Sequence, residues 1–409
     1  MIELTDAPVA GTARRRMLLV AGAVVVAVVL SLVFRAVSID DHASWMYDMK
    51  VFRKAGGRAL DGQTFYWPSP RSLFTHPPFN ALLFAVFSLP SLGFMAVVWN
   101  AVTLFCLQVL TWLMLEHAGV TSVRVRAAVS VAVAVLVLWF DPLRIELLLG
   151  QINVLCYLAL FIDLVVLRGR RWQGLLTGML AGIFLVPGFF AVYLLLTKRI
   201  RAFWCAVGAF AVTVAVGAAL RPGDSWTYWS GLFLDSRRVG SLQNPRAQAL
   251  QDVLARFLHT DTLGYASPVL VVVTCLAGLA LAVRKHRAGA EVAAVLICGL
   301  TVLVASPISW NHQFVWVVPI LVILSVAAVR RRSVVLAVVV CVSLLNFFLA
   351  PYTMGLPVDS AGALHLSVWQ CVLASTYLIN VLVLGLVVFF VQLPGDDSVH
   401  EEFELGRLS

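Results

Sequence analysis

Charged residues are scarce in this sequence: Asp, Glu, Lys and Arg make up 12% of its 409 residues, against about 25% in ordinary soluble domains. Hydrophobic residues make up 61%, and the mean hydropathy is +0.93. This balance excludes an ordinary soluble domain and indicates a polytopic membrane protein.

Several binding signatures are also missing. The sequence has no GxxxxGK and no GxGxxG after a strand, so we expect no bound nucleotide. It has no basic domain or reader motif for nucleic acid, and the net charge of +9 mostly reflects arginines in loops. The seven cysteines all fall inside hydrophobic runs without metal or redox spacing. We interpret them as small core residues.

Hydrophobic runs recur along the whole chain, and alternation of the kind a membrane barrel needs is absent. The predicted fold is therefore all-α, a polytopic integral membrane helix bundle. The runs predict about 12 transmembrane helices, near residues 17–36, 78–90, 93–116, 125–140, 151–168, 173–196, 202–220, 265–284, 289–306, 314–329, 333–350 and 367–392.

Loop charges predict the topology. Basic clusters at 14–16, 284–287 and 330–332 favour the cytoplasm, which places both termini inside. The prediction is a cytoplasmic tail (1–16), one transmembrane domain (17–392) and an acidic cytoplasmic tail (393–409). The outer loops then span 37–77, 221–264 and 351–366. Residues 1–16 are polar and no small-residue cleavage site follows the first run, so we expect the first helix to remain.

The middle of the chain conflicts with simple alternation. Basic clusters at 124–126, 168–171 and 198–201 cannot all be cytoplasmic if every helix between them spans fully. One segment is therefore predicted to be broken or re-entrant, at Pro187-Gly188 or at Pro90, since proline removes a helix hydrogen bond.

A polar, aromatic insert follows the first hydrophobic run. Asp48 lies where this outer loop becomes amphipathic, and a carboxylate so close to the membrane can serve as a general base. The alternative is a salt bridge to Lys50 or Arg53. Aromatic residues nearby, such as Trp45, suit the apolar ring faces of carbohydrate, although an interfacial aromatic belt explains them as well.

A second polar segment, residues 305–313, ends one hydrophobic run and begins the next at the same predicted face. His312 there can bind a phosphate when protonated or hydrogen bond a leaving oxygen, with help from the helix N-terminus. Capping by Ser306, Ser309 and Asn311 is the structural alternative.

Four ordered pieces of sequence carry a family resemblance. They are an outer Asp followed by Phe-Arg-x-Ala-Gly (48–56) and Asp61-Gly62, then Phe-Thr-His-Pro-Pro-Phe (74–79), Leu-Gly-Gln-Ile-Asn (149–153) and Ser-Pro-Ile-Ser-Trp-Asn-His (306–312). This pattern resembles the polyprenol-phosphate-mannose-dependent mannosyltransferases of glycosyltransferase family 87, from about residue 44 to about 316.

The resemblance implies a GT-C fold in a bacterial plasma membrane, with the active site facing the periplasm. It implies a polyprenyl phosphate mannose donor and a phosphatidylinositol mannoside acceptor, extended from four to five mannoses in α-1,2 linkage. Asp48 would be the general base of an inverting transfer, and His312 would work in the same site. No cofactor is implied, and no metal is required because no DxD is present at the outer face. Asp40, Asp41 and His42 are the weak alternative as a hard-cation site.

Other residues are candidates for substrate binding. They are Trp45, Lys50, Arg53, His76, Gln151, Arg237, Arg238, Asn244 and Trp310, with Arg246 and Arg256 as further cations that could equally meet anionic lipid headgroups. The sequence departs from the family at 184–187, where other members often carry Lys-x-x-Pro and this chain has Phe184. Asp141, Arg144 and Glu146 either line the cavity or, as we expect, pair with each other.

Two other functions remain open from the sequence. A lipid or sugar transporter would also have many broken helices, but it predicts charges near the bilayer midplane and two similar halves. Asp163 is the one carboxylate well inside a run, and no repeat is evident. A GT-C transferase for another lipid-linked sugar, such as arabinose, or for a lipomannan acceptor would share the fold and mechanism.

Overall fold

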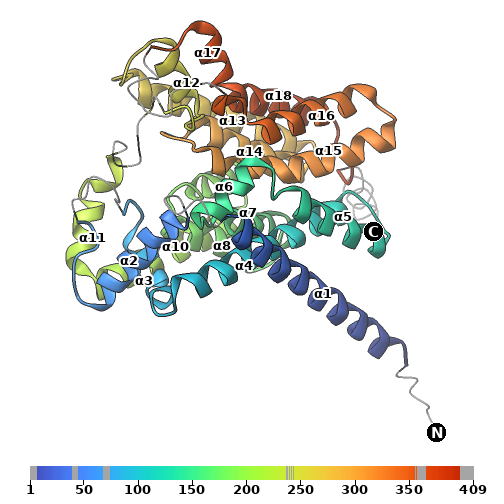
Figure 1. Cartoon of the computed structure of the whole chain (residues 1–409), viewed down its shortest axis with the longest axis horizontal. Helices are drawn as coiled ribbons and strands as arrows, with labels where there is room; N and C mark the ends of the chain where they lie inside the picture. The colour runs from blue at the N-terminus through green and yellow to red at the C-terminus, as the bar shows by residue number, and fades with distance from the viewer. Residues whose placement is uncertain are drawn as a thin grey trace.

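The computed structural model describes residues 7–38, 45–67, 74–235, 238, 240, 242, 244–354, 356 and 365–396 (Figure 1). Within these residues the regular structure is helical, and the one extended pairing is an antiparallel bridge between Ala247 and Trp310. The predicted all-α class is confirmed for this part of the chain.

The first half of the chain forms both short and long helices. These are α1 (Ala7–Val37), α2 (Tyr47–Leu60), α3 (Pro78–Ala85) with the 3-10 turn η1 (Val86–Ser88), α4 (Leu92–His117), α5 (Val123–Leu136), α6 (Asp141–Leu149), α7 (Asn153–Phe161) with the π-turn η2 (Ile162–Val166), α8 (Leu175–Ile183), α9 (Gly188–Leu196) and α10 (Ile200–Leu220).

The second half continues with helices of the same kinds. These are α11 (Pro222–Trp229), η3 (Leu232–Leu234), α12 (Leu250–Phe257), α13 (Ala266–Arg287), α14 (Glu291–Ala305), η5 (Asn311–Trp316), α15 (Val317–Arg331), α16 (Val334–Leu349), η6 (Pro351–Thr353), α17 (Val368–Leu373) and α18 (Thr376–Phe390). Serine caps begin several of them, because the Ser91, Ser122 and Ser333 side chains each accept a backbone N–H of the first helical turn.

Each of the twelve predicted runs contains a helix, but fewer are long enough to cross a membrane. In the described residues six helices qualify by length and composition, or seven if α5 and α6, which meet at 73°, form one bent span. The apolar helices at 78–88, 153–166, 291–305 and 376–390 are shorter. The predicted number of twelve crossings is therefore not confirmed.

Breaks fall where proline predicts them and elsewhere too. The 173–196 run divides into α8 and α9 around residues 184–187, as Pro187 predicts, and the 78–90 run ends before Pro90. The 367–392 run also divides, into α17 and α18, at Ala374 and Ser375. No proline or glycine occurs at that last break, so the sequence did not predict it.

Basic loops that are far apart in sequence meet at one end of the bundle. Glu291, buried at the start of α14, pairs with Arg199 at 2.8 Å, with His286 at 2.6 Å and with Arg168 at 3.7 Å. The loops before α8 and after α9 therefore lie at the same end, so the α8–α9 pair enters and leaves the bundle on one side. This resolves the conflict among the basic clusters.

Further contacts place the remaining basic loops at that end. Arg126 pairs with Glu116 at 3.0 Å, Arg330 donates to the Gly119 carbonyl at 2.8 Å, and Arg331 donates to the Gln392 carbonyl. Lys285, next to His286, donates to the Val391 carbonyl at 3.5 Å and so links these loops to the Glu291 end. In Figure 1, α11, α12 and α17 lie on the side away from the C-terminus. The bundle thus has a basic end and an opposite end that carries the short amphipathic helices.

A stripe of small residues lets α8 approach α10 closely. A Cβ added to Gly178 would lie 2.0 Å from the carbonyl oxygen of Ala206, and one on Gly174 would lie equally close to that of Ala202. Such close contacts between small residues favour helix association in membranes, because the hydrophobic effect does not drive apolar helices together in lipid. The stripe fixes the helix that leads into the 184–187 break.

We expect Gly178→Leu to prevent normal folding, because the larger side chain must displace the α10 backbone. Size-exclusion chromatography of the detergent-solubilised protein should show loss of the monodisperse peak. Gly208→Leu is the matched control, since a Cβ at Gly208 on α10 meets nothing within 4 Å. A Gly178→Leu variant that elutes and melts like the wild type would contradict this packing.

Candidate active site

The amphipathic helix α2 places Asp48 in its first turn. Its buried face, which includes Met49 and Phe52, packs on α3, while the N-terminal end reaches the end of α6. There the Met46 amide donates to the Leu148 carbonyl at 2.6 Å. A carboxylate in the first turn is also favoured by the positive end of the helix.

Asp48 is partly buried and has a neutral hydrogen-bond partner. Gln151 donates its Nε2 amide to Asp48 Oδ2 at 2.7 Å. Among the described residues no cation lies within ion-pair distance of Asp48, so the predicted alternative of a bridge to Lys50 or Arg53 is not what the structure shows. Burial raises the pKa of Asp48 to about 6, and the bond from Gln151 opposes that rise.

The turn that carries Gln151 needs a glycine. Gly150 has φ of 73°, and a Cβ there would lie 2.7 Å from both Met46 Sδ and Met49 Cβ. The Gln151 carbonyl accepts a hydrogen bond from Trp99 Nε1 at 2.8 Å. The backbone of α2 can therefore approach this turn closely, with Gln151 aimed at Asp48.

A second carboxylate lies beneath the same turn. Glu146 on α6 is buried and accepts hydrogen bonds from Asn153 Nδ2 at 2.8 Å and from the Val154 amide at 3.3 Å. The predicted pairing of Glu146 with Asp141 and Arg144 is wrong. Arg144 is exposed, and Asp141 has other partners. The sequence signal that could have indicated the observed partner of Glu146 is Asn153, in the nearby Gly-Gln-Ile-Asn segment.

Asp141 instead fixes the 3-10 helix η5. Its Oδ2 atom accepts hydrogen bonds from Asn311 Nδ2 at 3.0 Å, Tyr352 at 2.7 Å and Tyr377 at 2.8 Å. All four side chains are buried. A buried carboxylate with three donors fixes the position of the residue next to His312.

His312 is buried in η5, which packs against both α6 and α7. The structure shows no hydrogen bond from the His312 side chain to any other described residue, including Asp48. The two predicted catalytic residues therefore lie on elements that pack on the same α6–α7 corner, without touching each other.

A cavity of about 80 Å³ lies beside this corner. Its lining is mixed: amide and hydroxyl groups come from Asn153, Tyr157, Ser306 and Gln313, and the rest is apolar. The apolar wall includes Phe184 and residues on either side of the α8–α9 break, and no lining residue is charged. Neither Asp48 nor His312 lines this cavity, but its lining includes Asn153, two residues after Gln151, and Gln313, the residue after His312.

Backbone hydrogen bonds join the segment around Asn244 to the extended residues before η5. The Gln248 amide donates to the Ser309 carbonyl at 2.7 Å, and the Asn311 amide donates to the Arg246 carbonyl at 2.9 Å. Trp310 forms the bridge to Ala247 and is partly buried.

Arg256 anchors this arrangement from within, since it is fully buried and donates to the carbonyls of Asn244, Ala247 and Ala374. The sequence made Arg256 a weaker candidate for the donor phosphate or for a lipid headgroup, but in the structure its guanidinium binds backbone carbonyls instead. The Asn244 side chain itself accepts from the Arg246 amide at 2.9 Å.

Two other predicted contacts have structural partners. Arg53 donates to the carbonyls of Phe87 at 2.5 Å, Ser88 at 3.3 Å and Pro90 at 2.6 Å, and so caps η1. His76 packs among aromatic rings, the nearest being Phe184 with centroids 4.5 Å apart, and burial lowers its pKa to about 3. Substrate binding by either residue stays a prediction.

The remaining predicted contacts lie nearer the surface. Trp45 stands between Arg35 at 4.2 Å and Lys50 at 5.7 Å, in cation–π geometry. Arg238 donates to the Phe74 carbonyl at 3.2 Å and lies 6.0 Å from the Tyr66 ring. Arg237 falls outside the described residues, as do Asp40, Asp41 and His42.

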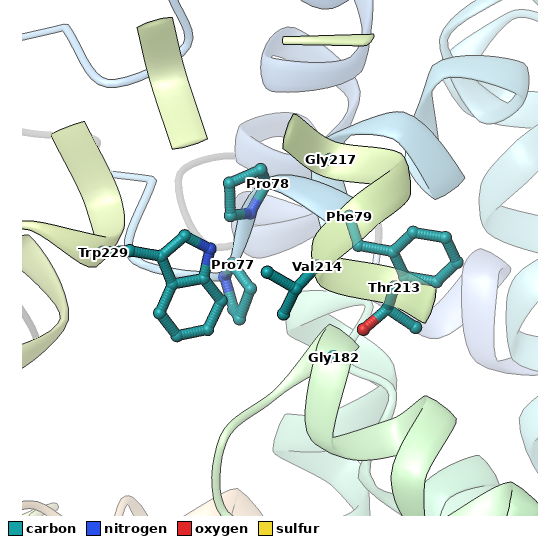
Figure 2. A pocket seen from close by; sticks show the side chains of 8 residues that line it. All are labelled: Pro77, Pro78, Phe79, Gly182, Thr213, Val214, Gly217 and Trp229. Atoms are coloured by element: carbon teal, nitrogen blue, oxygen red, sulfur yellow. The ribbon is translucent and has the colours of Figure 1, made fainter. Parts of the chain in front are cut away.

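A crevice at the start of α3 is apolar and narrow. Figure 2 shows Pro77, Pro78 and Phe79 facing Thr213 and Val214 of α10, with Trp229 across the opening. The Trp229 indole N–H is buried without a hydrogen-bond partner among the described residues. The crevice has no acid or base, so it is not a catalytic site.

No three metal-ligating side chains gather in the part of the chain that the structure describes. The expectation that the reaction needs no metal remains a prediction.

Comparison with known proteins identifies relatives. The family model described as glycosyltransferase family 87 matches residues 74–307, a span that includes the Gly150–Asn153 turn and ends before His312. A polyprenol-phosphate-mannose-dependent α-(1-2)-phosphatidylinositol mannoside mannosyltransferase of Mycobacterium tuberculosis is 30% identical over 72% of this chain and 74% of its own length.

Two further relatives have related names. The Mycolicibacterium smegmatis protein of the same name is 33% identical, covering 70% of this chain and 71% of its own. A phosphatidylinositol pentamannoside mannosyltransferase of Mycobacterium tuberculosis is 32% identical, covering 71% and 64%. No solved structure matches the chain significantly.

Proposed function

The chain belongs to glycosyltransferase family 87, and we propose that it transfers mannose from polyprenyl phosphate mannose to a phosphatidylinositol mannoside with Asp48 as the general base. The observation that carries this proposal is the setting of Asp48: partly buried, unpaired with any described cation, and aligned by Gln151. The names of the relatives support the donor and acceptor classes.

The setting suits a base at neutral pH. With a pKa of about 6, Asp48 is mostly ionised at pH 7, yet it binds a proton more tightly than an ordinary aspartate, whose pKa is about 4. General-base catalysis is most effective when the pKa of the base lies near the working pH. The raised pKa therefore favours removal of a proton from a sugar hydroxyl.

The reaction is a single displacement. The acceptor hydroxyl oxygen attacks the anomeric carbon of the donor mannose as Asp48 takes its proton, and the bond from that carbon to the phosphate oxygen breaks. Polyprenyl phosphate leaves with the electron pair. Because attack and departure occur on opposite faces, a β-linked donor gives an α-linked product.

The residues around the cavity divide the remaining tasks. The amides and hydroxyls of Asn153, Ser306 and Gln313 can bind sugar hydroxyls, while Phe184 and Tyr157 offer ring faces. No lining residue is charged, and we place the donor phosphate toward His312, whose ring can hydrogen bond the leaving oxygen.

We place the basic end of the bundle in the cytoplasm of a bacterium and the α2 end in the periplasm. The convergence of Arg168, Arg199 and His286 on Glu291 supports this, because it gathers the basic loops at one end as the positive-inside rule requires. Both termini are then cytoplasmic, and the active site opens on the outer face of the plasma membrane.

The proposed acceptor carries four mannoses and gains a fifth in α-1,2 linkage. A pentamannoside is the second candidate, because relatives named for that acceptor match at 31–32% identity, close to the 30–33% of the others. Identity of this kind does not choose between the two.

The test is reconstitution of the purified protein with synthetic polyprenyl phosphate mannose and each acceptor in turn, followed by mass spectrometry. The expected result is one added hexose on the tetramannoside, sensitive to an α-1,2-mannosidase. Addition to the pentamannoside alone would support the second candidate. Failure with both acceptors, while polyprenyl phosphate arabinose serves as donor, would overturn the choice of mannose.

We expect kcat/KM to fall about tenfold per pH unit below about pH 6, because protonated Asp48 cannot accept the acceptor proton. Gln151→Leu should move this acidic limb to higher pH, since the lost hydrogen bond lowers the pKa in the wild type. Rates measured between pH 4.5 and 8 check both expectations. An unshifted limb near pH 4 would argue against Asp48 as the titrating group.

A further inference from the structure

Glu146 is a buried carboxylate with no cation beside it. It is 1% exposed, and no ion pair joins it to any described residue. Burying such a group is costly unless its hydrogen bonds are well made. Its two donors, Asn153 Nδ2 and the Val154 amide, both lie at the start of α7.

The same residue also closes the other side of the turn. The amides of Gly150 and Gln151 both donate to the Glu146 main-chain carbonyl at 3.0 Å. With the Trp99 bond to the Gln151 carbonyl, the turn backbone is fixed at several points. The Gln151 side chain extends from this turn toward α2 and donates a hydrogen bond to Asp48.

The turn therefore stands between two carboxylates and gives one amide to each. Gln151 donates to Asp48, and Asn153 donates to Glu146. The charge of Asp48 also acts on Glu146. The titratable groups influenced by the charge of Asp48 are Glu146 on α6 and its sequence neighbour Tyr47, while its hydrogen-bond partner Gln151 is neutral.

We propose that Glu146 is a positioning residue that aligns Asp48 through the Gly150–Asn153 turn. Glu146 holds Asn153, Asn153 fixes the start of α7, and the fixed turn aims Gln151 at the base. This rests on the proposed function only in taking Asp48 as the base. Glu146 itself touches no reacting atom.

A matched pair of variants tests this link. Glu146→Gln and Glu146→Met both remove any charge and keep a similar shape, but only glutamine keeps a strong acceptor for Asn153. Asp163→Asn is the control, because Asp163 is another buried carboxylate that receives the amides of Gly174 and Thr177 at the start of α8.

The first readout does not depend on activity. Infrared titration, with Asp48 assigned by subtracting the Asp48→Asn spectrum, gives the midpoint at which that carboxyl protonates. We expect a higher midpoint in Glu146→Met than in Glu146→Gln, similar to that in Gln151→Leu, because the hydrogen bond from Gln151 is lost. Coincident midpoints in the Gln and Met variants would overturn the proposal.

The second readout is turnover. Glu146→Met should lower kcat 10–100-fold with both KM values unchanged, and Glu146→Gln should restore most of the rate. In a Gln151→Leu background, Glu146→Met should cost less than a further twofold, since the route to Asp48 is already cut. An equal loss in both backgrounds would show that Glu146 does not act through Gln151.

Asn153→Leu removes the donor instead of the acceptor and keeps the test decisive if the Met variant does not fold. It should raise the Asp48 midpoint, whereas an unchanged midpoint would count against the proposal. Separated midpoints in a protein that transfers no mannose would overturn the proposed function and leave the positioning role standing. Mannose transfer with coincident Asp48 midpoints in the two Glu146 variants would overturn the positioning role and leave the proposed function standing.

Discussion

Asp48→Asn should lower the rate of mannose transfer by about 10²–10⁴-fold, the usual contribution of a general base. Asparagine has the same shape and can still bond to Gln151, but it cannot accept the proton of the attacking hydroxyl. Because Asp48 forms no ion pair with a described residue, its loss should leave the fold intact. Single-turnover rates with purified protein, alongside chromatographic profile and melting temperature, measure both effects.

Asp61→Asn is the matched control for this substitution. Asp61 follows the same helix, is exposed, and lies at the far end of α2 from Asp48. Its rate should stay within twofold of the wild type. An Asp48→Asn protein of near wild-type activity would remove Asp48 from the role of base.

His312→Ala should reduce kcat by about 10²–10³-fold, the cost of losing one donor to charge that develops in a transition state. The donor KM should change little, because the hydrogen bond strengthens as the phosphate departs. His312 is buried on η5, and no hydrogen bond joins its side chain to another described residue. Rates at varied donor concentration separate the two constants.

His365→Ala provides the comparison, since His365 is exposed ahead of α17. It should leave both constants unchanged. A His312→Ala variant with a higher donor KM and an unaltered kcat would assign His312 to ground-state binding of the donor instead.

Local sequence signals predicted the apolar helices and one of the breaks, but not the helices α2, α6, α11 and α12, which lie outside the hydrophobic runs. Pro187 marks the division of the 173–196 run because its ring cannot continue a helix. The 73° bend between α5 and α6 was not predicted, because residues 136–140 are apolar and hydropathy continues through them. Asp141 followed by Pro142 is a helix-start signal that could have indicated it.

The site was predictable only in part for a related reason. Asp48 could be identified from the sequence alone, because a carboxylate is rare in so hydrophobic a chain. The partners of Asp141 lie 170, 211 and 236 residues away in sequence, so no local pattern could separate them from a pairing with Arg144. Gln151 and Asp48 are 103 residues apart, so their hydrogen bond could not be predicted from local sequence either.

The ion pairs at Glu291 also set an order for biogenesis. Arg168 and Arg199 acquire their shared carboxylate only when the ribosome reaches Glu291, 92 residues after Arg199. At the usual rates of protein synthesis that interval is roughly 5–18 s. During it the α8–α9 pair, whose connecting residues form one wall of the cavity, has no such anchor at its base. This wall of the cavity therefore gains its anchor only after synthesis has passed Glu291, well into the second half of the chain.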